Sequence, residues 1–376
     1  MTYRQCTFCV MDTSDPEITF DSSGQCNHCL AALNRWKSMS DSMNSGSELR
    51  STIERLRRVS NSDYNCILGL SGGVDSSYLA LKAHDWGLRP LVVHVDAGWN
   101  SEIAVRNIEG VVKSCNYDLH TIVVNWDAMR ELQLAFLRSG VANQDVPQDH
   151  AFFAHLYHFA IDNKIRYVLN GGNVASESIV PESWQWSAMD AKNIRAIYSR
   201  FGSGEFPNFQ LISFWQYYIE FPLLRRMSPV RPLNQMWYSK AKAAKELESR
   251  TGWTSYERKH EESVWTRFFQ NYYLPVRFGW DKRRPHLSSL IVSGQVTRLD
   301  ALEQLEKPLY EEREMRRDSA YIRRKLRLSE EEFQDLMETD VRDAGEFDNW
   351  SAQVARLKKV QVAASRLSGR RVAKYS

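Results

Sequence analysis

The chain has 376 residues, enough for two domains or for one large domain with an attachment. Apolar residues make up 43% and charged residues 25%, and no apolar run is long enough for a membrane helix, so we expect a soluble globular protein with no membrane contact. The net charge of +3 is too weak to indicate a nucleic-acid binder. The N-terminus shows no signal-peptide pattern, so we expect a cytoplasmic location.

Four of the six cysteines form two C-x2-C pairs near the N-terminus. These are Cys6 with Cys9, and Cys26 with Cys29. Each pair suits a knuckle whose two thiolates converge on one metal ion, and four thiolates fill a tetrahedral site. Two disulfides are the alternative, which a cytoplasmic location disfavours. The spacing therefore predicts a structural zinc ribbon over residues 1–37, whereas Cys66 and Cys115 have the surroundings of packing residues.

A regular alternation of strand and helix patterns follows a serine-rich stretch. Residues 38–51 are expected to form a loop, before a helix through residues 53–59. Apolar runs then alternate with segments of helical periodicity, which is typical of an α/β fold with a doubly wound parallel sheet. The expected strands, each buried, are Cys66–Leu70, Leu91–Val95, Thr121–Val124 and Tyr167–Leu169. Gly87 is expected to end the first intervening helix.

We expect this α/β body to span residues 38–235, and its last part, residues 180–235, to be an irregular, aromatic insertion that covers a substrate. Residues 236–376 are expected to form a helical region that contacts substrate or partners. Within it, Ser329 and Glu332 form the pattern of a capping box, which predicts the start of a helix. A basic cluster nearby is expected to be a solvated or interface surface, namely Arg323, Arg324, Lys325 and Arg327.

Two glycines and three serines follow the first expected strand, in S-G-G-V-D-S-S from Ser71 to Ser77. The spacing matches neither the dinucleotide G-x-G-x-x-G pattern nor the G-x4-G-K-[ST] phosphate loop. Backbone N–H groups at a helix N-terminus can instead converge on phosphate oxygens, with the serine hydroxyls as further donors. A carboxylate in such an anion site requires a cation beside it, so Asp75 predicts Mg²⁺ bound to a pyrophosphate group.

This loop resembles the pyrophosphate loop, or PP-loop, of the ATP pyrophosphatases, which include GMP synthetase, NAD synthetase, asparagine and argininosuccinate synthetases, and tRNA thiolases. The segments HVDAGW (94–99) and NGGNVASE (170–177) resemble two further nucleotide-site segments of these enzymes. The resemblance implies that Glu177 joins Asp75 as a magnesium ligand. It also implies an ATP site formed by Leu70, Ser71, Gly72, Gly73, Val74, Asp75, Ser76, Ser77, His94, Val95, Asp96, Gly171, Gly172 and Asn173.

Almost the whole chain resembles the N-acetyl sugar amidotransferase family of bacterial surface-polysaccharide and flagellar sugar biosynthesis. The cysteine ribbon, the three segments above and the run from residue 259 to residue 291 carry this resemblance, in that order. It implies that ATP adenylylates the acetamido oxygen of a free or nucleotide-linked sugar, that ammonia then attacks, and that AMP and pyrophosphate are released. The positions implied for catalysis are Asp75, Lys259, Lys282 and Arg283, and those for the substrate are Trp99, Asn100, Glu102, Arg267 and His286.

No cysteine is placed as the nucleophile of a glutaminase, so the chain is not expected to make its own ammonia. The family resemblance implies separate glutaminase and cyclase-like partner subunits, and a homo-oligomer stays open. A PP-loop tRNA thiolase is the alternative function, disfavoured because such enzymes commonly need a catalytic cysteine or an iron–sulfur cluster. A non-catalytic nucleotide-binding module is disfavoured because Asp75, Asp96 and Glu177 are all present.

Overall fold

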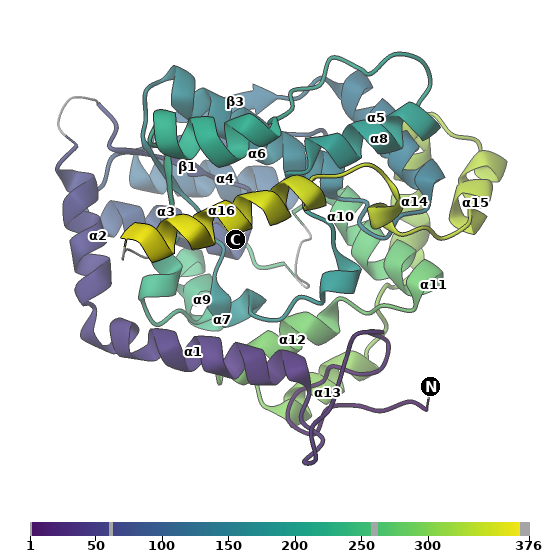
Figure 1. The fold of residues 1–376 in the computed structure, drawn as a ribbon, viewed down its shortest axis with the longest axis horizontal. Coiled ribbons are helices and arrows are strands. Elements are labelled where there is room, and N and C mark those ends of the chain that lie inside the picture. Colours follow the sequence, from purple (N-terminus) through teal and green to yellow (C-terminus); the bar gives the residue numbers. More distant parts are fainter. Residues whose placement is uncertain (1, 60–62, 257–261, 369–376) are drawn as a thin grey trace.

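The centre of the molecule is a parallel β-sheet covered by helices on both faces (Figure 1). This computed structural model describes residues 2–59, 63–256 and 262–368, with side chains described as far as residue 362. Within these residues the sheet has five strands in the order β3-β2-β1-β4-β5, every adjacent pair parallel. The strands are β1 Cys66–Gly69, β2 Pro90–Asp96, β3 Leu119–Val123, β4 Tyr167–Leu169 and β5 Ser228–Val230. The α/β class and the parallel sheet are therefore confirmed.

Side chains alternate along the central strands and feed two separate apolar cores. Ile67 and Val168 point to one face, and their neighbours Leu68 and Leu169 point to the other. The first core is closed by α5 Trp126–Ser139, α6 Val146–Asp162 and α8 Ala191–Phe201. The second is closed by α2 Ser47–Arg57, α3 Val74–Asp85, α4 Glu102–Cys115 and α9 Lys240–Thr251.

The order of the strands identifies one edge of the sheet as the place for a ligand. From β1 the chain moves outward through β2 to β3, and then returns to β4 on the opposite side of β1. The connections that follow β1 and β4 therefore diverge to opposite faces at neighbouring strand ends. In open α/β sheets, ligands bind at such a switch point, beyond the carboxyl ends of the strands.

The expected loop over residues 38–51 is wrong, because this stretch is helical. Helix α1 spans Asn27–Ser45 and crosses the boundary expected at residues 37 and 38, and only Gly46, with φ +61°, separates it from α2. The serine hydroxyls that suggested a loop donate back to the helix, as Ser38 does to the Arg35 carbonyl and Ser40 to that of Lys37. Gly87 ends α3 with φ +61°, as expected.

Two strands differ from expectation at the edges of the sheet. β3 is not buried, because it is an edge strand whose Val123 side chain is 73% exposed. β5 lies in the segment expected to be irregular, and it pairs with β4 through only three residues, the middle one Pro229. Proline removes a ladder hydrogen bond and is tolerated at an edge, which explains why the sequence pattern did not reveal this strand.

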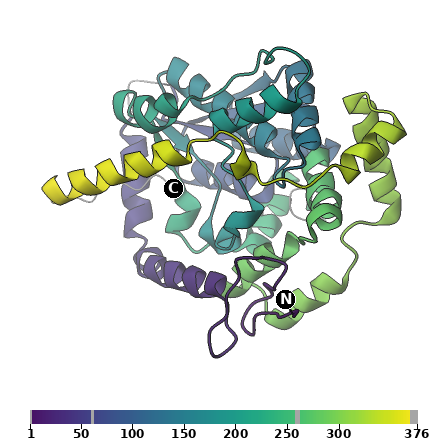
Figure 2. The same cartoon turned by 45° about the vertical axis from the view of Figure 1, so that its right-hand side comes forward.

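The C-terminal region wraps the body as a succession of helices, and the last of them projects from it (Figure 2). The capping box of Ser329 and Glu332 is confirmed at the start of α15. In the basic cluster, the Lys325 ammonium lies 4.4 Å from the ring centroid of Trp126, whereas Arg324 and Arg327 are exposed. No helix in the described ranges is both long and apolar enough to cross a membrane.

The remaining helices are α7 Val174–Glu177, α10 Val264–Phe268, α11 Leu274–Phe278, α12 Arg283–Val292, α13 Arg298–Glu306, α14 Glu312–Leu326, α15 Glu330–Glu338 and α16 Ser351–Ser368. The chain also has π-helical turns at Gln216–Leu224 and Phe269–Tyr273 and 3₁₀ turns at Glu182–Trp184, Pro232–Gln235 and Ala344–Glu346.

Candidate functional site

The glycine loop after β1 lies at the switch point and leads directly into α3. Gly72 has φ +83°, and a Cβ on it would come within 2.6 Å of the Ala104 carbonyl oxygen. A Cβ on Gly73 would come within 3.0 Å of a carboxylate oxygen of Glu262. Gly72 therefore requires glycine for its backbone conformation and for space, whereas a side chain at Gly73 would require Glu262 to shift.

The serines of the loop hydrogen-bond to one another. The Ser71 N–H donates to the Ser76 hydroxyl oxygen at 3.2 Å, and the two hydroxyl oxygens lie 3.0 Å apart. Ser77 is completely buried, and its hydroxyl finds no partner among the described residues. The loop thus offers hydroxyl donors and the N-terminus of a twelve-residue helix, which is the chemistry that suits a phosphate group.

The segment after β4 packs directly against this loop. A Cβ on Gly171 would come within 2.9 Å of the Asp75 carbonyl carbon and of the Ser76 nitrogen. Asn173 caps α7 and donates from Nδ2 to the Asp75 carboxylate at 3.1 Å. Two of the sequence segments predicted to share the ATP site therefore lie in contact.

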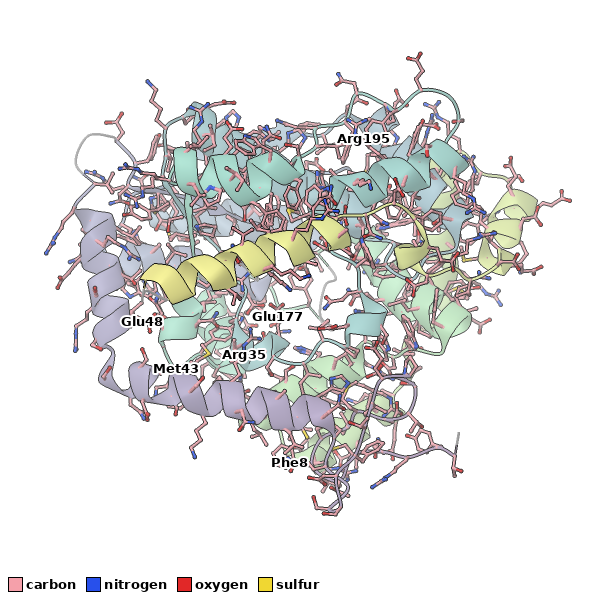
Figure 3. All side chains as sticks on the ribbon, viewed as in Figure 1. Phe8, Arg35, Met43, Glu48, Glu177 and Arg195 are labelled. Atoms are coloured by element: carbon pink, nitrogen blue, oxygen red, sulfur yellow. The ribbon has the colours of Figure 1, made fainter. Side chains whose placement is uncertain are left out.

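The two predicted magnesium ligands face the same phenol. The Tyr238 hydroxyl donates to Asp75 Oδ1 at 2.5 Å. Burial, and then the charges of Asp75 and Glu177, raise the pKa of Tyr238. Figure 3 labels Glu177 near the middle of the molecule. Carboxylate oxygens beside a phosphate loop are the ligands that Mg²⁺ takes, so the donor set fits the prediction. Tyr238 lies outside the recognised segments, and nothing in the sequence indicated it.

The end of β2 contributes a histidine whose tautomer follows from its contacts. His94 Nδ1–H donates to the Leu70 carbonyl at 2.9 Å, and Nε2 accepts from Asn100 Nδ2 at 2.9 Å. A carbonyl cannot donate, so the neutral imidazole carries its proton on Nδ1. Asp96 accepts from the Gly98 N–H at 2.7 Å. His94 thus ties the end of β2 to the start of the glycine loop.

The substrate positions predicted after β2 have different surroundings. Asn100 lies beside His94, and Glu102 is exposed in the first turn of α4. Trp99 is only 1% exposed, stacks on Trp265 at 5.4 Å and donates from Nε1 to Gln133. Its ring therefore has no free face for a sugar, and we leave Trp99 out of the proposed site.

Two of the predicted basic residues have structural partners. The Arg267 guanidinium pairs with the buried Asp318 carboxylate at 2.5 Å. Arg283 pairs with Asp281 at 2.8 Å and donates to carbonyl oxygens at the end of α13. Because both guanidinium groups are occupied by ion pairs within the chain, the proposed site does not include them. Lys259 lies outside the described residues.

Lys282 and His286 lie nearer the predicted site. His286 contacts the Ser176 carbonyl through Nδ1 at 3.2 Å, one residue before Glu177. The Lys282 ammonium lies 5.9 Å from the ring of Trp184, and its charge opposes the rise in pKa that desolvation causes at the buried Asp145 and the half-buried Asp149. Lys282 therefore lies close enough to both aspartates for its charge to act on them.

The two aspartates lie at the start of α6 and were not anticipated. Burial raises the pKa of Asp149 to about 7, despite the opposing charge of Lys282. Burial and the charge of Asp149 also raise the pKa of Asp145, whose carboxylate accepts a hydrogen bond from Thr266. The Glu262 charge also raises the pKa of Asp145. Asp145 therefore lies near Glu262, whose carboxylate is close to Gly73. Aspartates at helix starts are common, so the sequence pattern did not single these two out.

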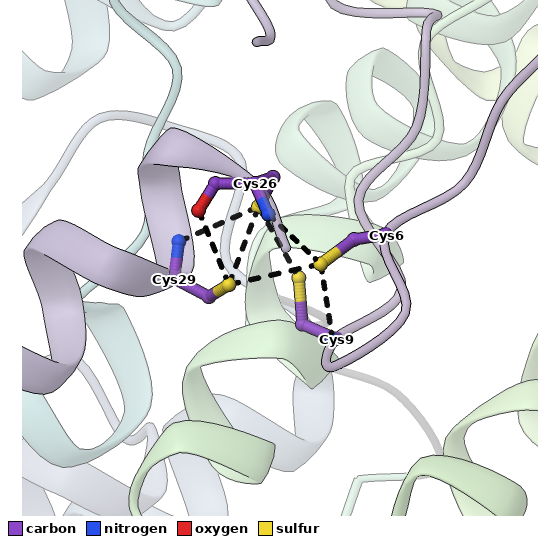
Figure 4. Close-up of side chains that lie close together, drawn as sticks. All are labelled: Cys6, Cys9, Cys26 and Cys29. Atoms are coloured by element: carbon purple, nitrogen blue, oxygen red, sulfur yellow. Dashed lines mark hydrogen bonds between the residues drawn. The ribbon is translucent and has the colours of Figure 1, made fainter. Parts of the chain in front are cut away.

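The predicted metal site is compact and fully buried (Figure 4). The four sulfur atoms of Cys6, Cys9, Cys26 and Cys29 lie within 4.8 Å of one another, with close pairs at 3.5, 3.6 and 3.7 Å. A tetrahedron with Zn–S bonds of about 2.3 Å has edges of about 3.8 Å. The spacing thus fits zinc and is too long for disulfides. Among the described residues this is the only group of three or more such ligands close enough for one ion.

The segment that carries the four cysteines (residues 6–29, the cysteine segment) is hydrogen-bonded to α12, which also contacts α7. Ser288 accepts a hydrogen bond from the Val10 N–H at 3.2 Å, and the next residue, Ser289, accepts one from the Ile179 N–H at 3.0 Å. Arg298 donates to the carbonyl oxygens of Cys6 and Cys9. Cys66 and Cys115 are buried elsewhere, and burial raises the pKa of their thiols to about 12 and about 11. Their interpretation as packing residues is confirmed.

Comparison with known proteins bears on the C-terminal region. No curated protein matches the chain. Residues 262–361 match the family model described as "LPS biosynthesis protein WbpG-like, C-terminal domain". The matched segment starts at Glu262, which touches the glycine loop, and includes Lys282 and His286. The C-terminal region is therefore similar to a domain of LPS (lipopolysaccharide) biosynthesis proteins, which supports a role in LPS or sugar biosynthesis.

Proposed function

We propose that the chain is an ATP-dependent amidotransferase that converts the acetamido group of a free or nucleotide-linked sugar into an acetamidino group, in LPS O-antigen or related sugar biosynthesis. One observation carries the proposal: the glycine loop, Asp75 and Glu177 meet at the switch point of the sheet, beside the segment that matches the WbpG-like domain. A strand-end anion site next to carboxylates suits a nucleotide polyphosphate with its metal ion.

The proposed reaction has two steps. The acetamido oxygen attacks the α-phosphorus of ATP, and pyrophosphate leaves, which gives an O-adenylyl imidate. Ammonia then adds to the imidate carbon, and AMP leaves with the original acetamido oxygen. The amide oxygen is a poor leaving group by itself, and this route converts it into part of a phosphate ester.

The residues divide this work among them. The backbone N–H groups from Gly72 to Ser76 would hold the pyrophosphate portion, and Asp75 and Glu177 would hold Mg²⁺, which supplies charge neutralisation. Lys282 would stabilise the departing pyrophosphate, and His286 would contact the sugar beside Ser176. Ammonia would come from separate glutaminase and cyclase-like subunits. A tRNA thiolase would need a reactive sulfur carrier, which the buried Cys66 and Cys115 do not offer.

The test is direct product analysis. Purified chain with ATP, Mg²⁺, ammonium and acetamido nucleotide sugars should form AMP, pyrophosphate and an amidine, detected by mass spectrometry. A heavy-oxygen label in the acetamido group should appear in AMP. ADP and phosphate as products would reject adenylylation, and sulfur incorporation into tRNA without amidine formation would favour the thiolase.

A further inference from the structure

One carbonyl oxygen in the glycine loop is held by three donors from outside the loop. The Gly72 oxygen accepts from Trp253 Nε1 at 2.9 Å, from the Tyr256 hydroxyl at 3.1 Å and from Asn107 Nδ2 at 3.4 Å. Trp253 is 4% exposed and Asn107 is 1% exposed, so the contacts are shielded from water. A carbonyl oxygen has two lone pairs, so three donors saturate it.

The donors come from two separate elements that are fastened to each other. Asn107 lies on α4, whereas Trp253 and Tyr256 lie in the segment after α9. The Thr254 N–H donates to Asn107 Oδ1 at 2.7 Å, and Asn107 Nδ2 donates to the Thr254 carbonyl at 3.0 Å. The rings of Trp253 and Tyr256 meet edge to face at 5.7 Å. The anchor is therefore a rigid unit and not a set of independent contacts.

This anchor fixes the direction of an N–H group in the loop. In a planar trans peptide the C=O of Gly72 and the N–H of Gly73 point in opposite directions. A peptide unit between two glycines can turn about the flanking φ and ψ angles, because no side chain restricts them. Contacts from outside the unit must therefore set its orientation. Donors that hold the Gly72 oxygen against α4 and the 253–256 segment direct the Gly73 N–H to the opposite side, toward the Ser71 hydroxyl at 3.3 Å.

We propose that Asn107, Trp253 and Tyr256 are positioning residues for anion binding, which hold the Gly72–Gly73 peptide in the orientation that presents its N–H to a polyphosphate. That this polyphosphate belongs to ATP rests on the proposed function. The orientation itself does not, because inorganic pyrophosphate would bind the same N–H. The three residues lie outside the S-G-G-V-D-S-S segment, and two of them lie in another part of the chain.

The variants Tyr256→Phe and Trp253→Phe each remove one donor and keep an aromatic ring. Tyr117→Phe is the matched control, because it removes a hydroxyl that donates at 3.0 Å to the Ala80 carbonyl on α3, away from the loop. Calorimetry with Mg²⁺ should show that each anchor variant binds pyrophosphate and ATP about 3- to 10-fold more weakly, as expected for one lost hydrogen bond. The double variant should lose more. Binding of adenosine, which has no phosphate, should stay within about twofold.

The outcomes separate the positioning role from a structural one. Weaker pyrophosphate binding with unchanged adenosine binding, and with a melting temperature close to that of Tyr117→Phe, supports positioning. Pyrophosphate binding equal to wild type in both single variants and in the double variant overturns it, as does an equal loss of pyrophosphate and adenosine binding. If the anchor variants bind pyrophosphate more weakly than wild type but wild type forms no amidine, the proposed function fails while the anchor stands. A wild type that binds no pyrophosphate overturns the anchor.

Discussion

Replacing Asp149 by asparagine should make the chain more stable near neutral pH and less sensitive to pH. Asp149 lies in the first turn of α6, and burial raises its pKa to about 7. No hydrogen bond or ion pair to its carboxylate is found within the described ranges, and Lys282 only partly offsets the burial. The folded protein thus keeps the Asp149 carboxyl protonated over a pH range in which the unfolded chain has already released this proton.

The sign and the size follow from proton linkage. Below pH about 4 both states are protonated, and the group contributes nothing. Between about 4 and about 7 the folded state binds more protons than the unfolded state, so the free energy of unfolding falls as pH rises. Above about 7 the cost is constant, with an upper limit of about 4 kcal/mol at about 1.4 kcal/mol for each pH unit. Asparagine resembles the protonated carboxyl in shape and never ionises.

Urea unfolding of wild type and Asp149→Asn between pH about 4.5 and about 8 measures this difference. The variant should come within about 1 kcal/mol of wild type at the acid end and exceed it by up to about 4 kcal/mol at the alkaline end. The same substitution at Asp162, exposed at the other end of α6, is the control for removing a surface carboxylate and should change the free energy of unfolding by less than about 0.5 kcal/mol. A difference between Asp149→Asn and wild type that stays constant across the range would refute the reasoning.

The remaining predictions concern the metal site, the reaction and one ion pair. Metal analysis should find one zinc per chain, which a variant with Cys26→Ser should lose together with thermal stability; zinc kept by the variant would contradict the site. Asp75→Asn and Glu177→Gln should each abolish AMP formation while circular dichroism stays unchanged, and turnover by either would remove it from the metal site. Ammonium should support amidine formation, whereas glutamine alone should not; glutamine-driven turnover by the pure chain would show an unrecognised glutaminase. Arg267→Met should destabilise the chain by about 3 kcal/mol in urea unfolding, because the buried Asp318 carboxylate then keeps only Arg317, whose side chain is largely exposed, as a cationic partner. A loss below about 1 kcal/mol would mean that Arg317 and the Tyr310 hydroxyl satisfy the Asp318 carboxylate without Arg267.

Local patterns predicted the parts of the fold that depend on local chemistry. Four strands, the helix end at Gly87 and the capping box at Ser329 each follow from a few neighbouring residues. The exposure of β3 could not be predicted, since it depends on which strand ends at the edge of the sheet. The helix over residues 38–45 was missed because serine hydroxyls can serve a loop or bond back to a helix equally well.

The candidate site divides in the same way. The glycine loop and its neighbours were found because backbone geometry and phosphate binding restrict the residue types within one short segment. Tyr238, Asp149 and Glu262 were missed because each reaches the site through contacts between distant segments, and tyrosine, aspartate and glutamate occur in many other settings. The burial of Trp99 could not be seen in the sequence either, since it stands among predicted site residues but its ring packs in the core.

The position of α12 has a consequence for dividing the protein into shorter pieces. Two consecutive serines of α12 contact different segments. Ser288 accepts a hydrogen bond from the cysteine segment, and Ser289 accepts one from the residues that follow α7. A truncation that removes residues 1–37 would leave the Ser288 hydroxyl without its donor and expose Ile179, which packs against the cysteine segment. The N-terminal segment is therefore not a detachable module, and exchanging it between related chains would require exchanging the matching face of α12 with it.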